Sequence, residues 1–260
     1  MAPAEVPDSR TTRDGRVMFA IPWHGRTLVG TTDTPIDEPS LEPLPQAEEI
    51  DFILETAGQY LHTAPTRADV RSIFVGIRPL VRSGDSRFSS AVTGTTEIHT
   101  DPTGLVTTTG GKWTTYRRMA EDTVNQAARL ARLPERPCVT RTLNVHGYHQ
   151  QADKFGALAH YGSDAIDISA IADSDAALAA PLHPSLPIAG AEVIWATRHE
   201  MARTVEDVLA RRTRALFLDA RAAIEMAPKV ARLMAGELGR DAAWEQEQVA
   251  AFTALAHQYL

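Results

Sequence analysis

The run from Leu105 to Ala131 constrains the fold more than any other part of the chain. Leu105–Thr109 is short and rich in β-branched residues, which is typical of a strand, and Gly110 and Gly111 follow it directly. Apolar residues then recur at helical spacing, at Tyr116, Met119, Ala120, Val124, Ala127, Leu130 and Ala131. The run therefore predicts a strand that turns sharply into a helix with one buried face.

The turn between this strand and this helix has the residues of an anion site. Glycines allow a positive φ and a close approach of a ligand to the backbone. Thr114 or Thr115 is expected at the N-cap, where it would satisfy amides of the first turn. Remaining amides and the helix dipole favour negative charge, and Lys112 adds a full positive charge. A purely structural turn with a solvated lysine is the alternative interpretation.

A family resemblance favours the anion site. The segment from Gly110 to Asp122 resembles the C-terminal flavin-contacting motif of FAD-dependent glycerol-3-phosphate dehydrogenases. Further segments resemble the same family in the same order, namely Val17–Gly25 with Gly30–Pro35, Ala64–Val70, Gly76–Leu80 and Arg198–Thr213. The resemblance extends over nearly the whole chain from about residue 14.

The resemblance implies roles for particular residues. Arg78 matches an active-site arginine and Lys112 a lysine beside flavin and substrate, so both are expected to bind the phosphate of glycerol 3-phosphate. The predicted FAD contacts are Gly110, Gly111, Lys112, Trp113, Thr114 and Thr115. FAD itself would carry the hydride, while the protein would orient the reactants and stabilise the negative charge of reduced flavin.

Two departures from the family pattern qualify these expectations. The chain contains no Gly-x-Gly-x-x-Gly motif, so it is expected to begin after the dinucleotide-binding half and after the family's candidate catalytic histidine. No catalytic residue is therefore assigned. Gly94 stands where the family carries a phosphate-binding arginine, and Arg82 or Arg87 could substitute for it.

Composition narrows the class of protein. The net charge of −7 argues against a nucleic-acid partner bound by bulk charge. The single cysteine, Cys138, excludes an internal disulfide and a cysteine zinc cluster. No run of eighteen apolar residues and no signal-peptide core is present, so the expected location is cytoplasmic. Peripheral contact of the C-terminal helix with the inner face of the cell membrane is a lesser alternative to its packing in the core.

The predicted fold class is α+β, in two domains. Residues 1–133 are expected to form the C-terminal part of an FAD and substrate domain, with a mostly antiparallel sheet and flanking helices. Its strands are predicted at 16–21, 26–31, 70–80, 95–100 and 105–109, and its helices at 46–61 and 116–133. Residues 134–260 are expected to form a small helical domain, with helices near 150–161, 163–172, 174–180, 191–202, 204–211, 217–235 and 241–259. Residues 181–187 read as a loop, and Pro228 is expected to start or kink a helix.

Other polar residues have structural interpretations. His24, His146 and His149 are read as structural, and His199-Glu200 lacks the second histidine of a zinc motif, so no metal site is predicted. The charged residues between Arg198 and Arg214 are spaced for ion pairs on helix faces rather than for nucleic acid.

Two hypotheses about function follow. The first is a part of an FAD-dependent oxidoreductase that oxidises sn-glycerol 3-phosphate to dihydroxyacetone phosphate and passes electrons to quinone or another acceptor. Since half of the cofactor cradle is missing, the isolated chain is expected to bind FAD poorly. The second is a non-enzymatic interaction or scaffold fragment, or the partner half of a split enzyme. Its expected partner is a separately encoded N-terminal half.

Overall fold

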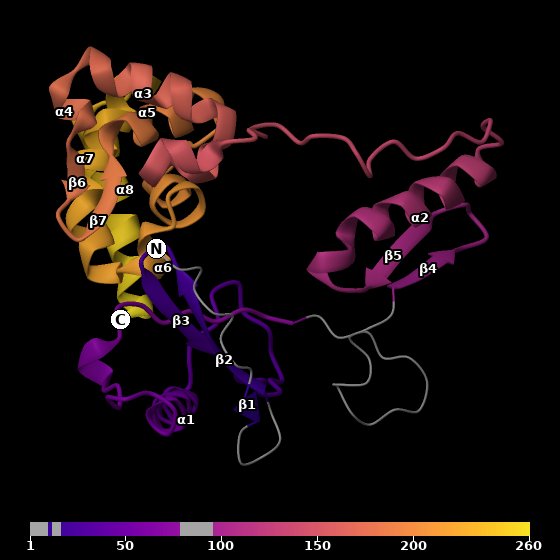
Figure 1. Cartoon of the computed structure of the whole chain (residues 1–260), viewed down its shortest axis with the longest axis horizontal. Coiled ribbons are helices and arrows are strands. Elements are labelled where there is room, and N and C mark those ends of the chain that lie inside the picture. The colour runs from indigo at the N-terminus through magenta and orange to yellow at the C-terminus, as the bar shows by residue number, and fades with distance from the viewer. Residues whose placement is uncertain (1–9, 12–16, 79–95) are drawn as a thin grey trace. The chain divides into compact units, whose positions relative to one another are not determined.

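The computed structural model describes residues 10–11, 17–78 and 96–260 of the chain (Figure 1). Gly94, Arg82, Arg87 and the end of the Gly76–Leu80 segment lie outside the described residues. The chain divides into two compact units. Residues 1–76 and 147–260 form the first unit, and residues 77–146 form the second. The boundary predicted between residues 133 and 134 stays a prediction.

The first unit begins with a small antiparallel sheet. Strands β1 (Arg10–Thr11), β2 (Val17–Trp23) and β3 (Arg26–Gly30) pair in that order, as Figure 1 shows. His24 and Gly25 make the hairpin turn, and both have a positive φ, of 46° and 73°. The predicted pair of strands is confirmed, with a tighter turn than the sequence indicated.

A helix and an irregular segment follow this sheet. Helix α1 (Ala47–Gly58) confirms the helix predicted over 46–61, and a 3₁₀ turn follows at Arg67–Asp69. The strand predicted over 70–80 is wrong for its described part, because residues 70–78 have no regular structure. Their backbone groups bond to the C-terminal helices instead. The Ile73 amide donates to the Tyr259 carbonyl at 2.9 Å, and the Ala220 amide donates to the Arg71 carbonyl at 3.0 Å.

The C-terminal part of the first unit is mainly helical. Its helices are α3 (Ala165–Ser174), α4 (Ala176–Ala179), α5 (Gly190–His199), α6 (Ala215–Leu218), α7 (Ala220–Leu238) and α8 (Ala242–Ala256). A 3₁₀ stretch with two glycine kinks (Ala152–Asp164), a π-helical turn (Asp207–Arg212) and a final 3₁₀ turn (His257–Tyr259) complete it. Asp175, Asp219 and Asp241 cap helices α4, α7 and α8 by accepting a hydrogen bond from an amide of the first turn.

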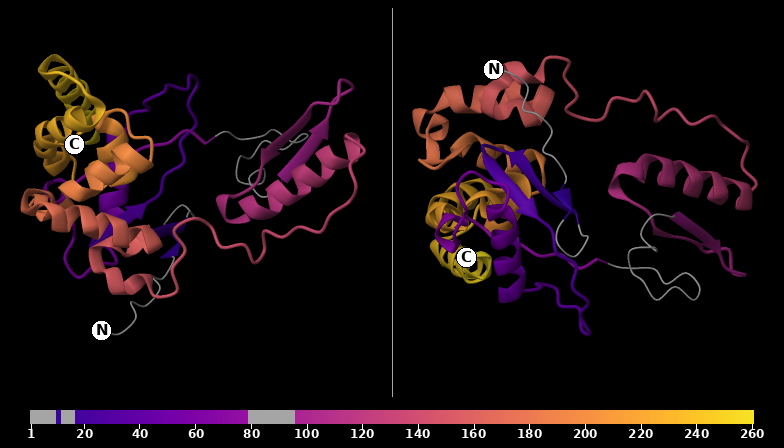
Figure 2. Two further views of the ribbon diagram at one scale, coloured as in Figure 1. Left: turned by 90° about the horizontal axis from the view of Figure 1, so that it is seen from above. Right: turned by 60° about the horizontal axis from the view of Figure 1, so that its bottom comes forward.

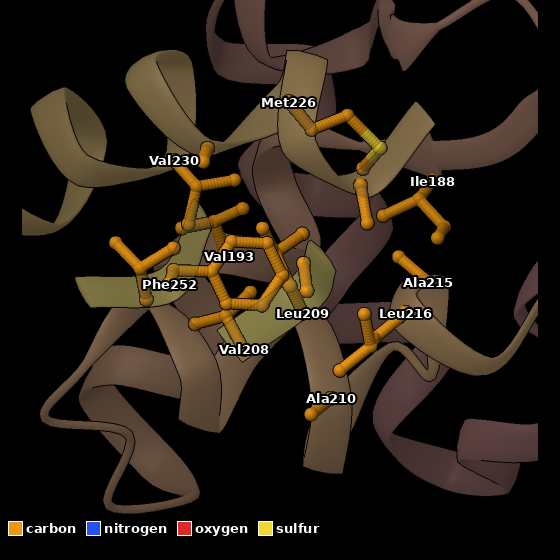
Figure 3. Packing of buried hydrophobic residues seen from close by; sticks show 14 of the residues in the cluster. Ile188, Val193, Val208, Leu209, Ala210, Ala215, Leu216, Met226, Val230 and Phe252 are labelled. Carbon is orange, nitrogen blue, oxygen red and sulfur yellow. The ribbon is translucent and has the colours of Figure 1, made fainter. Parts of the chain in front are cut away.

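Helix α7 lies at the centre of the main hydrophobic core. Met226 and Val230 of α7 pack with Val193 of α5 and Phe252 of α8, and all four side chains are buried (Figure 3). Pro228 does not start a new helix, because α7 is continuous from Ala220 to Leu238 and Pro228 lies on its exposed face. Since α8 buries Phe252 in this core, core packing of the C-terminal helix is confirmed.

A β-hairpin interrupts the helical part. Strands β6 (Pro181–His183) and β7 (Leu186–Ala189) pair antiparallel, so the loop predicted over 181–187 is wrong. Leu186 and Ile188 alternate inward and are buried in the core, while the intervening Pro187 is exposed. Three prolines in this short run argued against a strand, although buried and exposed residues alternate in it. The fold is α+β, with small antiparallel sheets and a largely helical C-terminal part.

The second unit is a hairpin with one helix. Strands β4 (Thr96–Thr100) and β5 (Val106–Gly110) pair antiparallel, with Thr96 opposite Gly110. A 3₁₀ turn (Trp113–Thr115) leads into α2 (Tyr116–Leu130), which lies along the hairpin in both views of Figure 2. The predicted order of strand, double glycine and helix is confirmed, but no residue of α2 is fully buried, so the buried face predicted for this helix is not observed. The hydroxyls of Thr108 and Thr123, 2.7 Å apart, join the strand to the helix.

Candidate functional site

The double glycine at the end of β5 is required by the local geometry. Gly110 and Gly111 have φ values of 71° and 81°, in the left-handed region that side chains disfavour. A Cβ atom on Gly111 would also lie 2.5 Å from Sδ of Met119 and 2.8 Å from Oγ1 of Thr96. Backbone conformation and packing therefore both select glycine at position 111.

Thr115 has a different role from the predicted one. It occupies the N-cap position of α2, but its side chain makes no capping hydrogen bond to that helix. The hydroxyl instead donates to the carbonyl of Lys112 at 2.8 Å and accepts from the amide of Lys112 at 3.4 Å. The prediction that a threonine hydroxyl caps the first turn of α2 is wrong for Thr115. Its hydroxyl instead holds the 3₁₀ turn together by hydrogen bonds to the backbone of Lys112.

Lys112 and Trp113 point outward from this turn. The side chains of Lys112, Trp113 and Thr114 are exposed, and Trp113 is 86% exposed. The indole stacks on the ring of Tyr116, with centroids 5.4 Å apart and planes 22° apart. Within the described residues the Lys112 ammonium makes no hydrogen bond or ion pair. The turn therefore presents a cation without a partner among the described residues.

The acidic residues of α2 are already paired with arginines of the same helix. Glu121 accepts a hydrogen bond from Arg117 at 2.8 Å, and Asp122 pairs with Arg118 at 3.0 Å. The hydrogen bond from Arg117 keeps the pKa of the Glu121 carboxyl below its ordinary value. These carboxylates are thus engaged along the helix and leave Lys112 available for an external anion.

Arg78 is the last described residue before the gap that ends at Thr96. Its side chain is exposed and lies in the irregular segment that follows α1. Arg78 and Lys112 fall in the same compact unit, and their convergence on one phosphate stays a prediction. The expected substitution of the family arginine by Gly94, with Arg82 or Arg87 as replacements, lies outside the described residues.

Histidines occupy structural positions in the described part of the chain. His24 lies in the β2–β3 turn, and its ring centroid is 5.2 Å from that of Trp23 and 5.7 Å from that of His160. His149 Nδ1 accepts a hydrogen bond from the Gln151 amide at 3.1 Å. The described residues contain no group of three histidine, cysteine or carboxylate side chains placed to hold a metal ion.

The predicted ion pairs between Arg198 and Arg214 are present, and one arginine of this run also reaches another helix. Arg211 pairs with Asp207 at 3.0 Å and also with Glu206. Arg198 reaches Glu237 of α7 at 2.5 Å. The Arg198–Glu237 pair joins α5 to α7, and the Arg211 pairs lie within the π-helical turn and its N-cap, so these contacts have a structural role.

A buried pair between Tyr161 and Glu192 of α5 was not predicted from the sequence. The Tyr161 hydroxyl donates to Oε1 of Glu192 at 3.2 Å, and Oε2 of Glu192 accepts from the Ala189 amide at 2.7 Å. Burial raises the pKa of the Glu192 carboxyl to about 7 and also raises the pKa of the Tyr161 phenol. A glutamate three residues after the N-cap was the available signal, since this spacing is typical of a capping box.

Two protein-family models match the sequence of this chain. The model of the FAD dependent oxidoreductases matches residues 2–117, and the model described as the C-terminal domain of alpha-glycerophosphate oxidase matches residues 103–248. The fold and the glycine turn are thus similar to those of FAD-dependent oxidoreductases, and the two matches together extend over residues 2–248. The chain belongs to the alpha-glycerophosphate oxidase C-terminal domain family, whose model covers more than half of it.

Relatives named glycerol-3-phosphate dehydrogenase support this membership. A mitochondrial enzyme of Arabidopsis thaliana is 35% identical over 269 residues, covering 92% of this chain and 42% of its own length. The mitochondrial enzyme of Homo sapiens is 35% identical over 260 residues, which cover 92% of this chain and 36% of the human enzyme. The family resemblance predicted from the sequence is confirmed.

A solved structure agrees with the fold. The glycerol-3-phosphate dehydrogenase from Bacillus halodurans, complexed with FAD, matches with a TM-score of 0.75 and 28% identity, over 96% of this chain and 52% of that one. The chain thus spans about half of that enzyme and a smaller share of the curated relatives. In the described part of the chain, no helix has both the length and the apolar character needed to cross a bilayer.

Proposed function

We propose that this chain supplies the substrate- and flavin-contacting part of an FAD-dependent oxidoreductase that converts sn-glycerol 3-phosphate to dihydroxyacetone phosphate. The observation that carries the proposal is the turn at Gly110–Thr115. It combines two left-handed glycines with a lysine whose ammonium is uncommitted among the described residues. Family membership and the relatives named glycerol-3-phosphate dehydrogenase favour this ligand over other anions.

The proposed ligand of the turn is one edge of a flavin ring. At Gly111 the space that a side chain would need is taken by Met119 and Thr96, so the proposed flavin contact at this position is made by backbone alone. Backbone amides and a lysine in that position would stabilise negative charge on the pyrimidine edge of the ring. Gly110, Gly111, Lys112, Trp113, Thr114 and Thr115 are the proposed contacts.

Arg78 and Lys112 would hold the substrate phosphate. Arginine offers two parallel donors to a phosphate, and lysine adds a mobile point charge. When bound, FAD supplies the hydride acceptor, so the residues of this chain bind, orient and neutralise charge. No described residue is assigned as the base, and quinone or another acceptor would receive the electrons.

A dinucleotide-binding half is part of the proposal. It would complete the cofactor cradle, because this sequence contains no Gly-x-Gly-x-x-Gly motif. The scaffold alternative has the same partner but no flavin chemistry. We also propose the domain division at residues 133 and 134, a cytoplasmic location, and at most peripheral contact with the inner membrane face.

The function can be tested by reconstitution. The chain is expected to bind FAD poorly alone and to bind FAD and oxidise glycerol 3-phosphate with a dye acceptor when combined with a dinucleotide-binding half. Lys112→Met should lower the rate about a hundredfold, as for loss of one charge-stabilising donor. Lys229→Met, which removes an exposed lysine of α7, is the matched control. A stable complex without flavin or activity would favour the scaffold instead.

A further inference from the structure

We propose that a cluster of three aromatic residues positions the guanidinium of Arg78 for the substrate phosphate. The cluster, called here the aromatic anchor, consists of Phe74, Phe217 and Tyr259. These positioning residues belong to the irregular segment after α1, to α6 and to the 3₁₀ turn that follows α8. The inference rests on the proposed function, because only that proposal makes Arg78 a phosphate contact.

The aromatic anchor is a series of ring contacts. The ring centroid of Phe217 lies 5.1 Å from that of Phe74 and 5.8 Å from that of Tyr259, with interplanar angles of 74° and 68°. Edge-to-face pairs of this kind attract each other beyond the apolar area that they bury. Phe217 and Tyr259 also pack against the main hydrophobic core, whereas Phe74 is 42% exposed. The core thus provides a fixed base to which Phe74 attaches the chain just before Arg78.

Two backbone hydrogen bonds reinforce these ring contacts. The Ile73 amide donates to the Tyr259 carbonyl at 2.9 Å, and the Ala220 amide donates to the Arg71 carbonyl at 3.0 Å. Since this part of the chain has no regular structure, the two bonds take the place of those that a sheet or helix would supply. The segment is therefore attached to the helical part at Arg71, Ile73 and Phe74.

Tyr259 has a further contact, with the loop that precedes α1. Its hydroxyl donates to Oε2 of Glu42 at 3.4 Å. Burial of the ring, together with the nearby Glu42 carboxylate, raises the pKa of the Tyr259 phenol, so the hydroxyl remains a donor at neutral pH. The carbonyl that accepts from Ile73 thus belongs to a residue whose own side chain is held.

The anchor limits the freedom of Arg78 through the chain itself. Arg78 follows Ile73 by five residues, and an extended chain advances at most 3.6 Å per residue, so its backbone stays within about 18 Å of Ile73. Ordering a flexible segment on binding costs conformational free energy, and this cost is smaller where the segment is already held. The anchor should consequently favour phosphate binding by Arg78.

Amide hydrogen exchange, followed by NMR in the full chain without flavin, tests whether the anchor holds the segment. Phe74→Ala removes the exposed ring and leaves the core residues in place. The Ile73 and Ala220 amides should then exchange at least about tenfold faster, while amides in the middle of α7 keep the wild-type rate. Phe74→Tyr, which retains the ring, should restore the slow exchange.

A matched variant controls for loss of apolar surface. Val75 is the next residue along the segment, is 38% exposed and has no ring to contact Phe217. Val75→Ala should change the exchange of the Ile73 amide by less than about threefold.

Kinetics of an assembled enzyme test the positioning role. The chain is combined with FAD and with the part of the Bacillus halodurans enzyme outside the matched region, expressed as a separate polypeptide. Phe74→Ala should raise the KM for glycerol 3-phosphate about tenfold and change kcat less than about threefold, because the anchor acts on phosphate binding. A merely structural role would lower the amount of active enzyme, and hence the apparent kcat, at an unchanged KM. Val75→Ala should leave both constants at the wild-type values.

A double-mutant cycle tests whether the effect passes through Arg78. In an Arg78→Ala background, Phe74→Ala should change the KM by less than about twofold, since the group that the anchor positions is then absent.

Three outcomes would overturn the inference while the proposed function stands. They are wild-type exchange of the Ile73 amide in Phe74→Ala, an unchanged KM in an active Phe74→Ala assembly, and a KM effect of Phe74→Ala that persists without the Arg78 guanidinium. A wild-type assembly that does not oxidise glycerol 3-phosphate would instead refute the proposed function, and with it the role given to Arg78.

Discussion

The thioether of Met119 lies directly beneath Gly111, so that a Cβ on this glycine would stand 2.5 Å from Sδ. The first turns of α2 thereby hold the end of β5 in a conformation open only to glycine. This contact fixes the backbone of the proposed flavin turn relative to the helix that follows it. The site is thus built by packing between neighbouring elements as well as by the residues that face a ligand.

Gly111→Ala should disrupt this turn. A left-handed alanine costs about 1–2 kcal/mol, and the displacement of Met119 and Thr96 adds to that cost. The variant should therefore lose hydrogen-exchange protection in β5 and α2. Gly104→Ala is the control, because Gly104 has a φ of 92° but its Cβ would meet no atom within 4 Å. Equal effects of the two variants would show that packing against Met119 is unimportant.

Because the carboxyl of Glu192 is buried, we expect the free energy of unfolding to depend on pH. Its folded pKa of about 7 lies above the ordinary 4.5, so folding favours its protonated form. The contribution of Glu192 to the free energy of unfolding is complete below about pH 4.5. It is lost as the pH rises through about 7, and the full loss is on the order of 3 kcal/mol.

Glu192→Gln should remove this dependence. Urea unfolding followed by the fluorescence of Trp195, which lies in the same buried cluster, measures it at about pH 5 and about pH 8. The wild-type chain should lose more stability than the variant across this interval. Burial lowers the pKa values of His24 and His160, so these groups act in the opposite direction in both proteins. A variant as pH-dependent as the wild type would exclude Glu192 as the source.

Cys138 should be more reactive than an ordinary cysteine. Its Sγ lies 3.0 Å from the Thr140 hydroxyl, and hydrogen bonds from Thr140 lower the pKa of the thiol. Alkylation by iodoacetamide near neutral pH should be several-fold faster for the wild type than for Thr140→Val. A variant that reacts at the wild-type rate over the whole pH range would show that Thr140 has no influence on the thiol.

Asp219 should contribute to the stability of the helical core. Its carboxylate accepts a hydrogen bond from the Ala222 amide at 3.1 Å and caps α7, whose buried face forms much of that core. Asp219→Ala should lower the free energy of unfolding by about 1 kcal/mol, whereas Asp219→Asn, which retains a capping oxygen, should lower it less. Thermal unfolding measures both, and identical losses would contradict the capping role.

Local patterns in the sequence were sufficient where local interactions decide the structure. The strand, glycine pair and helix between Leu105 and Leu130 were predictable because hairpin register, turn chemistry and helical period all agree there. The hairpin of β2 and β3 was predictable for the same reason.

The structure of the remaining elements depends on contacts between residues that are far apart in the sequence. Residues 70–78 have strand-like composition, yet Ile73 bonds to Tyr259 and Arg71 to Ala220, which no local pattern indicates. The β6–β7 hairpin depends on burial of Leu186 and Ile188 by helices that lie elsewhere in the sequence. Tyr161 and Glu192 are 31 residues apart, so their contact was visible only in the structure. At the site, the role of Thr115 depends on a 3₁₀ turn that the sequence did not reveal.

The most direct test of the account is an experimental structure of this chain assembled with a dinucleotide-binding half, FAD and a phosphate-bearing substrate analogue. The account predicts that the Lys112 ammonium lies within about 3–4 Å of the flavin ring or the phosphate, with the Arg78 guanidinium on the same phosphate. A structure in which FAD is bound but the Lys112 turn faces solvent, away from both flavin and Arg78, would contradict it.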